Sequence, residues 1–157
     1  DDVSDSGNHL VQECLGTRAS FPAVERRAMR LSDAVAVCII AQDGNGKILI
    51  LKAILKRRGY EIPGGGVEPG EEPEDAAARE LWEETGLRPI GPMRLVYLDR
   101  DNDGKVVACF LTTCEGTPVS GREGEVFWGE PGILLRSTNT YTEYNRKALK
   151  AAGIKVS

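Results

Sequence analysis

The chain has 157 residues, of which 41% are hydrophobic and 28% are charged, and its formal net charge is −4. This length and balance fit one globular domain with a single core, and they exclude a disordered or membrane-embedded chain. Because the net charge is negative, it offers no general attraction for nucleic acid, and we expect no nucleic-acid partner.

The sequence contains no segment typical of a membrane span or a targeting signal. The longest apolar run, Ala34 to Ala41, is far too short to cross a bilayer, and the chain does not open with a charged segment followed by an apolar one. We therefore expect a cytoplasmic protein without a membrane partner. The first residue is Asp1 rather than Met, so a processed chain, a trimmed chain and a piece of a longer polypeptide all stay open.

The cysteines and the single histidine limit the possible chemistry. Cys14, Cys38, Cys109 and Cys114 show no CxxC spacing, and all but Cys14 lie in apolar, strand-like segments. We expect buried thiols in a reducing compartment. His9 lies in the polar N-terminal segment, so we expect neither a histidine base nor a Cys/His zinc site.

Residues 1–9 are predicted to be a flexible N-terminal segment, and residues 10–157 a single domain that begins with an irregular arm over 10–31. Two β-rich runs, at 34–42 and 47–54, surround a DGNG turn and predict a hairpin. A second hairpin is predicted around the DNDG turn at 101–104. A short strand over 124–128 and a C-terminal helix over 140–153 follow, so the pattern predicts an α/β fold with a mixed sheet covered by helices.

Between the two hairpins, the sequence predicts a helix over Pro73–Thr85. Pro73 suits the first helical position, acidic residues follow it at the positive end of the helix dipole, and Gly86 suits the position just past the end. The apolar stripe expected to pack on the sheet consists of Ala77, Ala78, Leu81 and Thr85.

Beside that stripe lie three carboxylates, Glu80, Glu83 and Glu84, which stand three and four residues apart and therefore share one edge of the helix. Like charges at this spacing repel one another, so the cluster is either a solvated acidic face or a site for a hard divalent cation such as Mg²⁺. The glycines Gly64–Gly66 are predicted to form a loop before a short strand and to lie near this helix. Glycines let the backbone approach a ligand or metal closely, although they could equally serve only a turn.

The stretch Gly65–Leu87 resembles the signature of the Nudix hydrolase family. Every specified position of that signature is matched, namely by Gly65, Glu71, Arg79, Glu80, Leu81, Glu83, Glu84, Gly86 and Leu87. The order of a hairpin, the motif, a second hairpin and a C-terminal helix also resembles the α/β/α sandwich of this family. The resemblance implies a pyrophosphohydrolase that uses Mg²⁺ or Mn²⁺ to hydrolyse a nucleoside diphosphate linked to another group.

The resemblance also assigns roles to the motif residues. Glu80, Glu83 and Glu84 would be metal ligands and catalytic residues, with the backbone carbonyl of Gly64 or Gly65 near the metal. Glu83 or Glu84 would also position or deprotonate the attacking water. Four further motif residues are expected to be structural: Gly65, Glu71, Arg79 and Gly86. Of these, we expect Arg79 and Glu71 to join loops by a salt bridge.

Further candidates lie outside the motif. Glu125, or Glu123 beside it, could be an additional catalytic carboxylate, or simply an exposed charge. Basic residues before the glycines could neutralise substrate phosphates or be solvated surface: Lys52, Lys56, Arg57 and Arg58.

Two kinds of side chain could contact a base. Tyr60 or Phe127 could stack on it, although core packing is the commoner role of an aromatic residue in a strand. Asn139 could bind a base edge or cap the last helix.

For the substrate, the loop and the short connection after the motif look more like MutT-type enzymes that hydrolyse nucleoside triphosphates. The arm ending in VERRAMRLSDAVAV, Val24 to Val37, instead resembles the lead-in of ADP-ribose pyrophosphatases, which implies ADP-ribose or nucleotide sugars as the alternative and a possible homodimer. ADP-ribose enzymes typically carry a proline some sixteen residues beyond the motif, and dinucleoside polyphosphate enzymes carry a tyrosine in a similar place. Both residues are missing here. A third alternative is a regulatory domain that binds nucleotides without cleaving them, but such a domain would be expected to lose motif carboxylates.

Overall fold

A computed structural model describes residues 28–53, 59–121, 124–136 and 141–156. Within these ranges the strands are β1 (Ala36–Gln42), β2 (Ile48–Ala53), β3 (Tyr60–Glu61), β4 (Gly64–Gly66), β5 (Arg94–Arg100), β6 (Val106–Thr113) and β7 (Gly124–Gly129). The helices are α2 (Pro73–Thr85) and α3 (Tyr141–Ala151), with short 3₁₀ helices η2 (Leu31–Asp33) and η3 (Pro131–Arg136).

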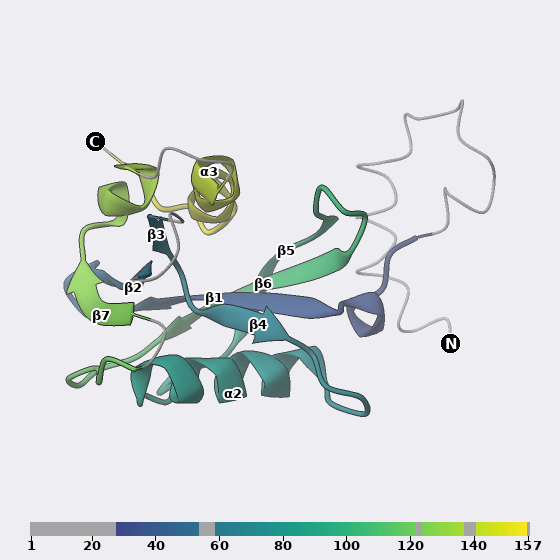
Figure 1. The fold of residues 1–157 in the computed structure, drawn as a ribbon, viewed down its shortest axis with the longest axis horizontal. Helices are drawn as coiled ribbons and strands as arrows, with labels where there is room; N and C mark the ends of the chain where they lie inside the picture. Colours follow the sequence, from purple (N-terminus) through teal and green to yellow (C-terminus); the bar gives the residue numbers. More distant parts are fainter. Residues whose placement is uncertain (1–27, 54–58, 122–123, 137–140, 157) are drawn as a thin grey trace.

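The strands form one mixed sheet in the order β3-β2-β1-β6-β5, with β4 also paired to β1 and β7 also paired to β2. Only the β1–β6 pair is parallel among the described strand pairs. Helix α2 covers one face of the sheet, and α3 with η3 covers the other (Figure 1). The predicted α/β fold with a mixed sheet between helices is confirmed.

Both predicted hairpins form, but the strands of the first one separate. β5 and β6 pair along most of their length, whereas β1 and β2 share only the pair Gln42↔Ile48 next to the turn. Beyond that pair, β1 lies between β4 and β6, and β2 lies between β3 and β7. The two strands of the first hairpin therefore lead into two different parts of the sheet, because each pairs over more residues with strands from elsewhere in the sequence.

The prediction of a glycine loop before a short strand was wrong, because the glycines are themselves strand β4, antiparallel to β1. A β-carbon on Gly64 would stand 2.4 Å from the backbone oxygen of Val37 and 3.1 Å from Cα of Cys38. The strand can come this close to β1 only because it carries no side chain there.

Helix α2 begins and ends where the sequence predicts. Gly86 closes it with a left-handed backbone (φ 74°), and its amide donates to the carbonyl of Trp82 at 2.8 Å. The predicted stripe needs one correction, since Ala76 is fully buried and Ala78 only half-buried. The face that meets the sheet is thus rotated from the predicted one toward Pro73, which is also buried.

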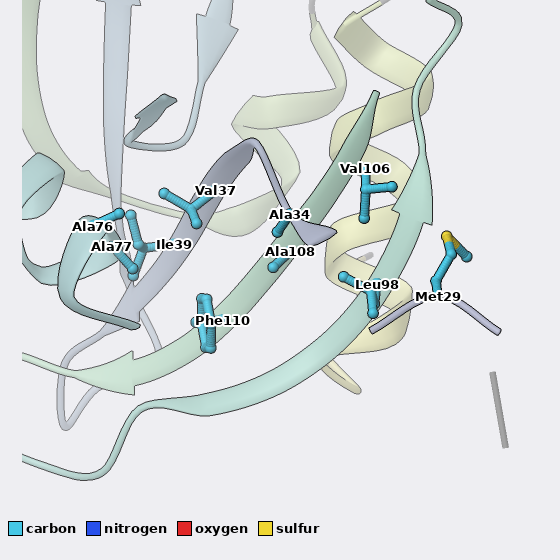
Figure 2. Packing of buried hydrophobic residues seen from close by; sticks show 10 residues of the cluster. All are labelled: Met29, Ala34, Val37, Ile39, Ala76, Ala77, Leu98, Val106, Ala108 and Phe110. Carbon is cyan, nitrogen blue, oxygen red and sulfur yellow. The ribbon is translucent and has the colours of Figure 1, made fainter. Parts of the chain in front are cut away.

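Each face of the sheet has its own core. On the α2 side, Ala76 and Ala77 lie beside Ile39 of β1, in a cluster that continues through Phe110 of β6 to Leu98 of β5 (Figure 2). On the α3 side, a second group packs under the helix: Ile40, Ile48, Ile50, Cys109, Leu134, Ala148 and Leu149. No helix in the described part of the chain is both long enough and apolar enough to span a bilayer.

The burial predicted for the cysteines is found for two of the three described thiols. Cys38, Cys109 and Cys114 are all unbridged; Cys109 and Cys114 are buried, and Cys38 is half-buried. Several predicted features lie outside the described residues: residues 10–27 of the arm, His9, Cys14, Lys56, Arg57, Arg58, Glu123 and Asn139.

Candidate functional site

Each glycine of strand β4 contacts a side chain of helix α2, two of them through a hydrogen bond. The amide of Gly64 donates to Glu84 Oε1 at 2.8 Å, and the carbonyl of Gly66 accepts from Arg79 Nη2 at 2.9 Å. Between them, a β-carbon on Gly65 would stand 2.3 Å from Glu80 Oε2. Three consecutive glycines therefore lie along the carboxylate edge of the helix, and the missing side chain of Gly65 makes room for the Glu80 carboxylate.

Arg79 connects the acidic side chains to one another. Its Nε and Nη2 donate to the two carboxylate oxygens of Glu71 at 2.8 and 3.0 Å, and Nη1 donates to Glu80 and Glu83, both at 3.1 Å. With the bond to Gly66, all five guanidinium N–H groups have acceptors. The Glu71–Arg79 ion pair expected from the sequence is thus present, and it ties the turn after β4 to the helix.

The two residues of this pair shift each other's pKa in opposite directions. Hydrogen bonds from Arg79, and then from the amide of Glu68, lower the pKa of Glu71 from 4.5 to about 2. The same bond to Glu71 raises the pKa of Arg79 above its ordinary value. The pair is therefore ionised at neutral pH, and it holds the Arg79 guanidinium in place beside Glu80 and Glu83.

Glu80, Glu83 and Glu84 converge on one pocket of about 90 Å³, which is completed by Leu51 and Val126 of β2 and β7 and by Gly121 and Gly124. Glu80 is mostly enclosed, with 14% of its side chain exposed, whereas 53% of Glu83 is exposed. These carboxylates therefore line a hollow between helix and sheet.

The side chains that line this pocket suit a hard divalent cation, because they supply carboxylate oxygens. The Glu80 carboxylate can lie there because position 65 has no β-carbon to occupy the same space. Among the described residues, however, no three His, Cys, Asp or Glu side chains are already grouped as metal ligands would be. In this structure Arg79 holds Glu80 and Glu83, and the Gly64 amide holds Glu84.

A second pocket, of about 190 Å³, lies on the α3 side of the sheet. Its lining includes Cys38, Glu61, Gly64, Tyr97, Tyr144 and Ala148. Gly64 borders this pocket, and its amide also bonds Glu84 of the carboxylate pocket. A molecule that reached from one pocket to the other would therefore pass the glycine strand.

The structure does not bring the other described candidates to the carboxylates. Glu125 of β7 lies opposite Lys52 of β2, and both are exposed. Because its neighbours Gly124 and Val126 line the carboxylate pocket, Glu125 points to the other face of the sheet. Lys52 Nζ lies 6.0 Å from the centroid of the Tyr60 ring.

Tyr60 and Phe127 contact each other edge to face, with ring centroids 6.3 Å apart. Both rings pack against the core on the α3 side, which is the packing role weighed in the sequence.

Sequence reasoning missed Asn145. It is buried in α3, borders the second pocket, and donates through Nδ2 to the carbonyls of Tyr60 and Leu134, each at 2.9 Å. An available signal was its position four residues before the buried Leu149, which places a polar side chain on the packed stripe of the helix.

Comparison with known proteins assigns the family. The family model of the NUDIX domain matches this sequence over residues 32–144. An ADP-ribose pyrophosphatase from Methanocaldococcus jannaschii is 36% identical over 112 residues, which cover 66% of each chain. An RNA pyrophosphohydrolase from Roseobacter denitrificans is 39% identical over 61 residues, 38% of each chain, so this chain spans well under half the length of that relative.

The structural neighbours share the fold. A MutT Nudix hydrolase from Burkholderia pseudomallei superposes with a TM-score of 0.60 and 21% identity, covering 74% of this chain and 97% of that one. The domain match includes the whole motif, both hairpins, and β7. This chain is a member of the Nudix family.

Proposed function

We propose that the protein is a divalent-metal-dependent hydrolase that cleaves a phosphoanhydride bond in a nucleoside diphosphate linked to another group. The observation that carries the proposal is the convergence of Glu80, Glu83 and Glu84 on one pocket behind a strand of three glycines. A solvated acidic face would not need that strand, nor an arginine whose N–H groups are all taken by Glu80, Glu83, Glu71 and the Gly66 carbonyl.

Glu80, Glu83 and Glu84 would hold Mg²⁺ or Mn²⁺, with the carbonyl of Gly64 or Gly65 as a further oxygen donor. A bound cation of this kind offsets negative charge on phosphoryl oxygens and lowers the pKa of water. The chain's own residues do the positioning: the Gly64 amide orients Glu84, and Arg79 orients Glu80 through a guanidinium that Glu71 fixes.

Glu83 or Glu84 would accept the proton of the attacking water as its oxygen bonds to phosphorus, and the phosphate on the other side of the broken anhydride would leave. Glu125 is not included in this proposed set, because it points to the other face of the sheet. Lys52 and Tyr60 lie on that face too, where they could contact the part of a substrate that extends past Gly64.

Nucleoside triphosphates are the first proposed substrate class, because the turn after β4 and the short connection after α2 resemble those of MutT-type enzymes. ADP-ribose or a nucleotide sugar is the second, and the 36% identity to an ADP-ribose pyrophosphatase over 66% of the chain favours it. Both classes contain the nucleoside diphosphate that the carboxylate pocket would engage.

The test incubates the full chain with Mg²⁺ or Mn²⁺ and a panel of nucleoside triphosphates, ADP-ribose, nucleotide sugars, dinucleoside polyphosphates and an RNA with a 5′-triphosphate. Chromatography identifies the products, and ¹⁸O-labelled water shows which phosphorus is attacked. We expect turnover of at least one compound that is lost on removal of the cation with a chelator. Tight binding of one compound without turnover of any would instead show a nucleotide-binding domain that is not an enzyme.

A further inference from the structure

Four residues form one row across the sheet beneath α3. Gly64 of β4 lies opposite Cys38 of β1, Cys38 lies opposite Cys109 of β6, and Cys109 lies opposite Tyr97 of β5. Cys38, Cys109 and Tyr97 all belong to the group of side chains packed with α3, so the two thiols point to the same face of the sheet. Figure 1 shows β4, β1, β6 and β5 side by side.

The two thiols have the spacing that a disulfide requires. Neighbouring strands are separated by about 4.8 Å, and the α-carbons of bridged cysteines lie about 4.4–6.8 Å apart. Both cysteines are unbridged, and the two thiols lie close enough for each to shift the pKa of the other. Cys38 Sγ also lies 3.8 Å from the hydroxyl of Tyr97. The second thiol therefore lies one strand away from the first, at the paired position and on the same face of the sheet.

Access to the two thiols differs. Cys38 lines the pocket of about 190 Å³ on the α3 side, whereas Cys109 is fully buried behind it. A pocket of this volume has ample room for hydrogen peroxide, since a water molecule takes up only about 30 Å³ in the liquid. A small solute that enters the pocket thus meets Cys38 first, and Cys109 can react only through Cys38.

We propose that Cys38 and Cys109 form a dithiol that hydroperoxides oxidise to a disulfide, with Cys38 as the attacking thiol and Cys109 as the resolving one. Cys38 sulfur attacks the terminal oxygen of hydrogen peroxide, the O–O bond breaks, and Cys38 sulfenic acid and water form. Cys109 sulfur then attacks Cys38 sulfur and displaces its oxygen as a second water. Two thiols lose two electrons and two protons in all, and one peroxide is reduced to two waters.

The row also connects this pair to the carboxylate pocket. A β-carbon on Gly64 would stand 3.1 Å from Cα and 3.2 Å from Cβ of Cys38, so the two backbones leave no slack between them. The Gly64 amide in turn holds Glu84 at 2.8 Å. A disulfide that draws Cys38 toward β6 would pull Cys38 away from Gly64 and so disturb the strand that positions Glu84. This coupling rests on the proposed function, and we expect oxidation to cause a loss of hydrolysis that dithiothreitol restores.

The experiment treats the folded chain of 157 residues with a small excess of hydrogen peroxide and then blocks remaining thiols with N-ethylmaleimide. Trypsin releases Cys38 in residues 31–47 and Cys109 in residues 106–122, and chymotrypsin cuts after Phe110 to separate Cys109 from Cys114. We expect a linked pair of peptides carrying Cys38 and Cys109, which dithiothreitol separates. This readout does not depend on any enzymatic activity.

Two variants sharpen the test. In Cys109→Ala the resolving thiol is gone, so a sulfenic-acid probe such as dimedone should label Cys38 after peroxide. In Cys114→Ser the Cys38–Cys109 link should form as in the unaltered chain, because burial raises the pKa of the Cys114 thiol to about 11 and it lies outside the row.

The proposal is overturned if the unaltered chain forms no Cys38–Cys109 link, if Cys114 is oxidised first, or if the link forms only in denaturant. A link without any loss of hydrolysis, in a chain that has been shown to hydrolyse a substrate, would refute the coupling through Gly64. Absence of all hydrolysis would refute the proposed function, but it would not contradict a Cys38–Cys109 disulfide identified by peptide mapping.

Discussion

Gly65 of β4 faces Glu80 of α2 so closely that a β-carbon at position 65 would stand 2.3 Å from one carboxylate oxygen and 2.7 Å from the other. Gly65 does not have the positive φ that favours glycine, so its backbone conformation would admit alanine. Glycine is therefore required at position 65 because the Glu80 carboxylate occupies the space that a side chain would fill.

Gly65→Ala is expected to displace the Glu80 carboxylate while leaving the fold intact, because the end of a flexible side chain can move away at little cost. We predict weaker Mn²⁺ binding by calorimetry and lower turnover, of the order of 10–100-fold, the range seen when the support of a metal ligand is removed. Gly66→Ala is the matched control, since the nearest atom to its β-carbon would be Val35 O at 3.9 Å. Equal Mn²⁺ affinity in both variants would contradict the role given to Gly65.

Gly64→Ala should act on stability instead. Its β-carbon would stand 2.4 Å from the backbone oxygen of Val37, and a sheet backbone cannot yield as a side chain does. We predict a loss of about 1–3 kcal/mol in the free energy of unfolding, as for other overpacked sites. Urea denaturation measures it, and a variant as stable as the unaltered chain would show that β4 is not held against β1 as described.

Removing one negative charge from the cluster tests the proposed metal site. We predict that Glu83→Gln and Glu84→Gln each lower turnover by at least about a hundredfold, because the amide can neither take a proton from water nor balance the cation's charge. Glu74→Gln, in the exposed first turn of the same helix, is the matched control and should turn over normally. Circular dichroism checks that the fold is retained, and normal rates in both variants would mean that the cluster is only an acidic face.

The ion pair between Glu71 and Arg79 predicts a pH dependence of stability. The pKa of Glu71 is lowered in the folded chain to about 2 from an ordinary 4.5, so its contribution to stability is complete above about pH 4.5 and is lost as the pH falls toward 2. Glu71→Gln should therefore be less stable than the unaltered chain near neutral pH, and the difference should shrink between about pH 4.5 and 2.

Urea midpoints across this pH range measure that difference. Glu72→Gln, at the exposed neighbouring position, is the control and should differ little from the unaltered chain at any pH. A Glu71→Gln deficit that stays constant down to about pH 2 would show that the lost stability does not come from the charge of Glu71.

The sequence could predict what depends on local pattern. Helix α2 was found to the residue, because Pro73 and Gly86 mark its two ends chemically, and both hairpins were found from their turns. The strand formed by Gly64–Gly66 was missed because three glycines carry no strand propensity, and only contact with β1 makes them a strand. Asn145 was missed because its partners, the carbonyls of Tyr60 and Leu134, are set by tertiary packing. The face to which Glu125 points likewise depended on strand register, which the sequence does not specify.

The parallel pairing of β1 with β6 also bears on how the chain reaches this structure. β1 ends at Gln42, and its parallel partner begins only at Val106, after the glycine strand and α2 have been completed. Pairing of strands this distant in sequence closes a long loop and is slow compared with local hairpin formation. A nascent chain that has not yet emerged past β6 contains Gly65 and Glu80, but β1, on which the glycine strand packs, still lacks its partner β6. We therefore expect the carboxylate pocket to be among the last parts of the protein to form.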